Sequence, residues 1–168
     1  MMNRIAKLLL AVSFAAVTCT LAADQAGRFD PESYLGNWKG GGKVLIPWTG
    51  MQVPFDGGAE FSRDSTDVIH TSFSGQAAGF KYSDSGRLIV DPETDSLTWD
   101  LWDNHGKHRR FRGVALGDIL LGQGVRGGPT YTVANEFVRP DSLNIKVTST
   151  DARGTVRSLV TLGLLREE

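Results

Sequence analysis

Few residues of this chain combine the side-chain type and the spacing that catalysis or metal binding requires. Its three histidines are His70, His105 and His108. His105 and His108 are close enough to reach one metal ion, but the nearby sequence offers no third ligand, so solvated hairpin residues are favoured and no metal site is expected. His70 lies within an alternating β-type run. It is either an ordinary strand histidine or a group that faces a cavity and binds a ligand or moves a proton.

The sequence has no standard catalytic motif: no glycine-flanked serine, no phosphate-binding loop and no paired histidines at metal spacing. Gly40-Gly41-Gly42-Lys43 lacks the spacing of a phosphate-binding loop, and no helix is expected after it. We therefore assign no catalytic residue, and a non-enzymatic protein is favoured. The alternative is a cavity enzyme of the isomerase or cyclase type, in which His70 acts as a base beside a carboxylate such as Glu60 or Glu136.

The segment Lys107–Arg112 is the one dense basic run in the sequence. In a strand, its side chains alternate, so Arg110 and Arg112 face one way while Arg109 and Phe111 face the other. Two interpretations remain open. The run is an exposed strand whose charge is balanced by nearby aspartates, or one arginine reaches a cavity and binds an anion there.

Aromatic residues supply the candidate lining of a binding site. The chain has four tryptophans and eight phenylalanines, and most must be buried in so small a domain. In a small β-barrel, the core and the wall of any ligand cavity are made by the same inward-facing positions. The residues that we expect to bind a ligand are Trp38, His70, Phe73, Trp99, Phe111 and Phe137.

The first 23 residues predict a cleavable secretory signal. Arg4 and Lys7 give a positive start, Leu8–Val17 is an apolar run, and small residues follow up to Ala23. The apolar run is too short for a membrane anchor, which needs about 20 residues. Lipid attachment at Cys19 is a further alternative, but the residues before Cys19 match that type of signal poorly.

Removal of this segment would leave residues 24–168 as one domain, periplasmic or secreted, with no transmembrane segment. Cys19 is the only cysteine, so the exported domain would contain no disulfide and no thiol nucleophile. The formal net charge of −1 argues against a nucleic-acid-binding protein, which would show a strong basic excess.

Hydrophobic alternation and turn residues predict an all-β fold with one short helix at Asp30–Leu35, capped by Asp30 and ended by Gly36. About eight to ten short strands joined by tight turns indicate an antiparallel up-and-down β-barrel, with a two-sheet sandwich as the alternative. A final run that is apolar on both faces predicts a strand covered on both sides. The expected strands include 66–74, 97–101, 130–138, 143–147 and 156–165, and the expected turns 84–86, 91–95, 104–106, 139–141 and 151–154.

The segment Leu35–Gly42, in which Gly36-Asn37-Trp38-Lys39-Gly40 opens the first strand, resembles the start of lipocalin-like (calycin) barrels. Such barrels include the nitrobindin-like proteins and related bacterial families of unassigned function. The resemblance implies that Trp38 closes one end of the barrel and that Arg166, from the last strand, packs over it. Heme-binding nitrobindins carry a histidine on that last strand, and this chain has none there, so heme is doubtful and no cofactor is expected.

Together these features predict an exported β-barrel that holds a small, mainly apolar or amphipathic molecule in its interior. Two alternatives stay open: the cavity enzyme described above, and a barrel that acts through its outer surface in an envelope complex. The expected partner is the small ligand, and a homodimer is left open.

Overall fold

The computed structural model describes residues 28–46, 49–64, 67–125, 128–138 and 141–168. The segment predicted to be a secretory signal, 1–23, lies outside these ranges. Within them, no helix has both the length and the apolar character needed to cross a bilayer.

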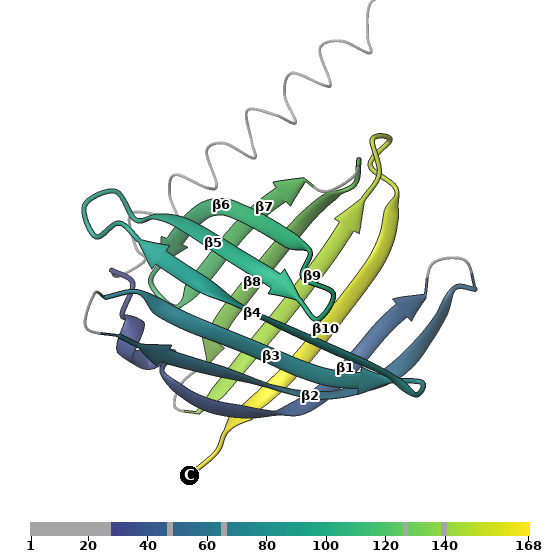
Figure 1. Ribbon diagram of the computed structural model, residues 1–168, viewed down its shortest axis with the longest axis horizontal. Coiled ribbons are helices and arrows are strands. Elements are labelled where there is room, and N and C mark those ends of the chain that lie inside the picture. Colours follow the sequence, from purple (N-terminus) through teal and green to yellow (C-terminus); the bar gives the residue numbers. More distant parts are fainter. Residues whose placement is uncertain (1–27, 47–48, 65–66, 126–127, 139–140) are drawn as a thin grey trace, which may run out of the picture.

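Ten antiparallel strands close into a barrel (Figure 1), which confirms the predicted fold class. Each strand pairs with its neighbours in sequence, and β1 pairs with β10 to complete the ring. Closure gives each of the ten strands a hydrogen-bonded neighbour on both sides, so the barrel has no unpaired edge strand. The strands are β1 (Gly36–Ile46), β2 (Met51–Arg63), β3 (Ile69–Ala77), β4 (Phe80–Val90), β5 (Ser96–Asp103), β6 (His108–Leu116), β7 (Ile119–Val125), β8 (Thr130–Val138), β9 (Ser142–Thr150) and β10 (Val156–Arg166).

Alternate side chains along each strand point into the barrel and form its core. On β5, for example, Leu97, Trp99 and Leu101 are buried, as the alternation of this segment predicts. The buried residues concentrate at one end of the barrel, where Tyr34, Trp38 and Phe137 form a connected aromatic cluster with ring centroids about 6 Å apart. This is the closed end. The other end carries the β1–β2 and β3–β4 hairpins, which extend away from the core in Figure 1.

The closed end is held together by η1 (Pro31–Ser33), a single 3-10 turn capped by Asp30. It is shorter than the helix predicted for Asp30–Leu35, because Gly36 adopts a φ of 124° and the first strand begins at once. The backbone of Tyr34 accepts a hydrogen bond of 2.9 Å from the indole Nε1 of Trp38. The turn and the first strand are thereby joined through the Trp38 ring.

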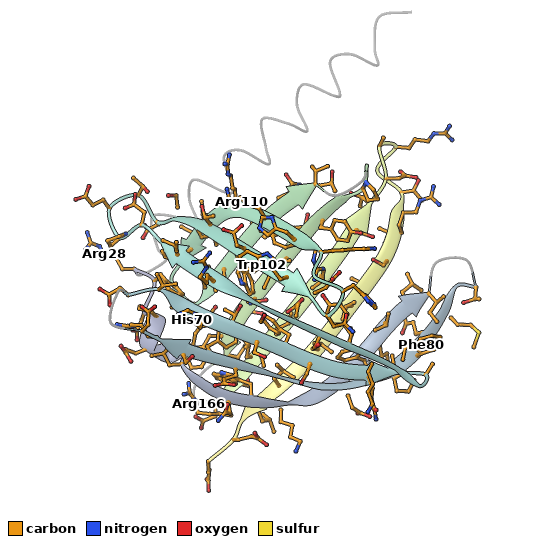
Figure 2. The ribbon with its side chains drawn as sticks, viewed as in Figure 1. Arg28, His70, Phe80, Trp102, Arg110 and Arg166 are labelled. Atoms are coloured by element: carbon orange, nitrogen blue, oxygen red, sulfur yellow. The ribbon has the colours of Figure 1, made fainter. Side chains whose placement is uncertain are left out.

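Arg166 lies over Trp38, as the family resemblance implied. Its guanidinium carbon is 4.5 Å from the centroid of the indole, and Figure 2 places the residue at the base of the barrel. The same guanidinium donates hydrogen bonds to the carbonyl oxygens of Leu35 (2.6 Å) and Ser33 (2.7 Å). One side chain of the last strand is therefore joined to the first turn by two hydrogen bonds and to the first strand by its contact with Trp38.

Two expectations about individual strands were wrong. Residues 84–86 lie within β4 and form no turn, because Gly86 allows close approach to the backbone of Asp100 on β5. The reversal that the turn residues suggested lies earlier, at Ala78 and Gly79. The last strand is covered on one side only: Leu165 is 66% exposed on its outer face. The predicted turn at 139–141 falls partly outside the described residues.

Candidate functional site: the barrel interior

A cavity of about 350 Å³ occupies the interior of the barrel beside the closed end. Its wall is mainly aliphatic and aromatic, with contributions from most strands. It reaches the β3–β4 hairpin, where Phe80 is 81% exposed and marks the open end (Figure 2). The apolar lining residues include Val44, Phe55, Phe73, Trp99, Phe111, Val133, Ile145, Val147, Val160 and Leu162.

Glycines on the inner face give the large side chains their room. A Cβ at Gly75 would lie 2.3 Å from the ring of Phe55, and one at Gly57 would lie 2.7 Å from it. Phe55 therefore covers two neighbouring glycines. Phe111 covers Gly122 and Gly124 in the same way on the other side of the barrel. Small residues beside large ones fix the position of these two rings on the cavity wall.

A polar cluster of three residues lies in the wall near the open end. The Tyr82 hydroxyl donates to Asp84 Oδ2 at 2.5 Å, and Arg109 donates to the same oxygen at 2.9 Å and also to the Tyr82 hydroxyl. The side chains of Asp84 and Arg109 are only 7% and 13% exposed. Arg109 thus takes the inward position that the alternation of the basic run allowed, while Arg110 faces outward.

Burial governs the titration of this cluster. It raises the pKa of Asp84 above its ordinary value, although the hydrogen bond from Tyr82 and the nearby Arg109 act in the opposite direction. Burial also raises the pKa of Tyr82, and the charge of Asp84 adds to that effect. Tyr82 therefore remains a protonated donor at neutral pH.

Asn135 contributes a second polar group to the cavity wall. It is 0% exposed and lies on β8 between Val133 and Phe137 on the inner face. Neither its Oδ1 nor its Nδ2 has a hydrogen-bond partner among the described residues. Asp84 Oδ1 and Arg109 Nε are likewise buried and unpartnered within the described chain. The cavity therefore has mainly apolar walls and a few polar side chains, the usual composition of a small-molecule site.

The structure brings three of the predicted ligand-binding residues together. Phe73, Trp99 and Phe111 all line the cavity, and the indole Nε1 of Trp99 donates to the Thr71 hydroxyl at 3.0 Å. Trp38 and Phe137 lie deeper, in the aromatic cluster of the closed end, and are not among the lining residues. Their position gives them a role in closing the barrel.

His70 lies on the outer surface, away from this cavity (Figure 2). Its side chain is 46% exposed and its Nε2 is 2.9 Å from Asp64 Oδ2. Its neighbours Ile69 and Thr71 occupy the inner face. The expectation that His70 faces the interior is therefore corrected. Glu60 and Glu136, its suggested partners, are also exposed.

His108, Arg110 and Arg87 belong to a cluster on the outer face of β4–β6. Asp100 accepts two hydrogen bonds from Arg110, at 2.7 and 2.9 Å, and contacts His108 at 2.6 Å. His108 stacks on Trp102, and the guanidinium of Arg87 lies 5.6 Å from the centre of the Trp102 ring. Trp102 thus packs against two side chains of the protein itself. No cluster of three metal-ligating side chains occurs among the described residues.

A second, larger hollow of about 1020 Å³ runs along the outer face of β1–β4. It is a shallow groove lined by polar residues such as Lys39, Asp56 and Gln76. None of the unpartnered buried polar atoms found in the described chain belongs to its lining. We therefore place the candidate site in the interior.

Sequence reasoning missed Tyr82, Asp84 and Asn135 as site residues. Asp84 was assigned to a turn, because Asp-Ser-Gly is typical turn chemistry. Asn135 lies within the predicted strand 130–138, where period-two alternation puts it on one face with Tyr131, Val133 and Phe137. A polar side chain at an inward position of an otherwise apolar face was the signal available in the sequence.

No protein-family model and no curated protein matches this chain. Solved structures do. The S-type phycobiliprotein lyase CPES from Guillardia theta is similar with a TM-score of 0.57 and 12% identity, over 82% of this chain and 90% of that one. Rv2717c from M. tuberculosis is similar with a TM-score of 0.61 and 14% identity, over 81% and 94% of the two chains. The fold is therefore that of a ten-stranded lipocalin-like barrel, and at these identities the likeness concerns the fold alone.

Proposed function

We propose that this protein is an exported binding protein that holds a small, mainly apolar molecule inside its barrel. The observation that carries the proposal is the interior cavity of about 350 Å³, whose walls are mainly apolar and include three residues with buried polar atoms that lack a partner among the described residues. Small-molecule sites have volumes of about 300–1,000 Å³ and this same mixture of lining groups.

The comparisons support a binding barrel in a general way. One neighbour is a phycobiliprotein lyase, which is in keeping with a small molecule handled in this kind of barrel. The proposal concerns a molecule other than heme, because the last strand lacks the histidine that heme-binding nitrobindins carry there. The alternative of a cavity enzyme loses support, because its suggested base, His70, lies outside the cavity. Export rests on the sequence of residues 1–23.

Native mass spectrometry of protein purified from the cell envelope tests both parts of the proposal. We expect a mass that lacks the first 23 residues, plus a bound small molecule that is released on denaturation. A cleaved chain with a clean apo mass under gentle conditions would contradict binding. An uncleaved or lipid-modified chain would contradict the proposed form of export, without bearing on the cavity.

A further inference from the structure

The unpartnered amide of Asn135 is an unusual feature of this core. The side chain is fully buried, yet both of its polar ends lack a partner among the described residues. Burying polar groups without hydrogen bonds destabilises a folded protein. A leucine of similar size would avoid this cost and would match its neighbours on the inner face. The asparagine therefore points to a hydrogen-bonding partner that does not belong to the chain.

The two residues that flank Asn135 in the sheet offer no polar group to its side chain. In the sheet it lies opposite Leu120 on β7 and Ile145 on β9, both apolar. Its backbone oxygen is engaged separately, 3.3 Å from the hydroxyl of Tyr34. The backbone oxygen is thus engaged, while the side chain of this lining residue carries one amide donor group and one carbonyl acceptor, side by side.

The polar cluster of Tyr82, Asp84 and Arg109 limits the charge that a ligand can carry. Asp84 and Arg109 are paired at 2.9 Å, so their charges compensate within the wall. The free Asp84 Oδ1 accepts and the free Arg109 Nε donates. The pair is neutral as a whole, so it offers no net charge to balance either an anion or a cation unless the ion pair is broken. Both polar centres of the cavity thus favour an uncharged group that can donate and accept.

Building on the proposed binding function, we infer that the ligand is a neutral molecule with an apolar body and one carboxamide-type group that pairs with Asn135. A primary amide, a lactam and an imide each carry a donor and an acceptor side by side. Such a group forms two hydrogen bonds with the amide of Asn135 in one ring. These bonds satisfy both ends of the side chain, and the apolar body fills the space among Phe73, Trp99 and Phe111.

A matched series of probes tests this inference on the mature protein. Naphthalene-2-carboxamide, 2-ethylnaphthalene and naphthalene-2-carboxylate at pH 8 share one apolar body and differ in the polar group. Quenching of tryptophan fluorescence reports binding, with isothermal calorimetry to confirm the stoichiometry. We expect the carboxamide to bind about tenfold more tightly than the hydrocarbon, as two hydrogen bonds would give, and the carboxylate to bind most weakly.

The variant N135L should abolish this preference. We expect it to bind the carboxamide about tenfold more weakly and the hydrocarbon at least as well as before. Its unliganded form should melt at a higher temperature, because two unpaired polar groups are removed. N144L is the control: Asn144 is exposed on the outer face of the neighbouring strand β9. It should leave the preference unchanged.

The outcomes separate the inference from the proposed function. If no probe binds, the proposed function itself fails. If the hydrocarbon binds as tightly as the carboxamide, or if N135L keeps the preference, the cavity binds small molecules but Asn135 does not select them. A water molecule that satisfies Asn135 would give this second result and would overturn the inference. Tightest binding of the carboxylate would overturn the neutral character of the ligand. The probe series needs only the unmodified protein, so it remains decisive if N135L fails to fold.

Discussion

At the scale of single residues, two aspartates of this protein, Asp100 and Asp84, lie in contrasting environments. On the outer face, Asp100 is surrounded by its partners Arg110 and His108. The hydrogen bonds from Arg110 hold the pKa of Asp100 below its ordinary value, against a smaller opposing effect of burial. Inside the barrel, burial raises the pKa of Asp84. The outer carboxylate therefore stabilises the fold through its partners, whereas the inner one, on a residue that lines the cavity, keeps an oxygen without a partner among the described residues.

The variant D100N tests the outer network. A carboxylate whose pKa is lowered in the folded state stabilises that state above its unfolded pKa of about 3.9, and this stabilisation is lost as the pH falls through the folded value. We expect D100N to lower the free energy of unfolding by on the order of 1 kcal/mol at pH 7. Urea titrations should show this difference narrowing below about pH 4. D56N, at an exposed residue of β2, controls for the lost charge. A difference that stays constant from pH 7 to pH 3 would argue against the network.

At the scale of elements, the first turn and the last strand stabilise each other through Arg166. Its hydrogen bonds to Leu35 and Ser33 satisfy carbonyl groups at the end of η1, and its guanidinium covers Trp38. These contacts close the ring of strands where its two chain-terminal members, β1 and β10, pair. They also seal the end of the barrel beneath the cavity.

We expect R166M to lower the free energy of unfolding by about 2 kcal/mol, because methionine keeps the packing but loses both hydrogen bonds and the contact with the indole. R157M is the control on the same strand. Arg157 pairs with Asp151 but is 58% exposed, so its loss should cost at most about 0.5 kcal/mol. Thermal denaturation followed by circular dichroism provides the comparison. Equal effects of the two substitutions would show that Arg166 does not secure the closed end.

The elements also show what the sequence could and could not predict. Strand β8 was predicted with the bounds that the structure gives, because its period-two pattern is local. The alternation of β3 indicates that His70 faces outward, because its neighbours Ile69 and Thr71 occupy the opposite, inner face. The inner ion pair could not be predicted. Asp84 on β4 and Arg109 on β6 are 25 residues apart in sequence and are separated in the sheet by strand β5. A local pattern carries no information about a contact between them.

At the scale of the whole molecule, the barrel is packed at one end and hollow toward the other. The aromatic cluster of Tyr34, Trp38 and Phe137 fills the closed end. Beyond it, the glycines at 57, 75, 122 and 124 leave room for the rings of Phe55 and Phe111. The cavity is the space that remains between these rings and the other lining residues. A packed barrel would have suited a protein that acts only through its surface. The hollow interior is what favours a binding protein.

Titration with the neutral apolar fluorophore N-phenyl-1-naphthylamine measures whether this interior binds molecules. The unmodified protein should bind one fluorophore, with increased emission. V147W should abolish binding, because the indole fills the cavity that Val147 lines. K146W places the same indole at the adjacent, exposed position and should bind as the unmodified protein does. Equal binding by V147W and K146W, or none by the unmodified protein, would contradict a ligand site inside the barrel.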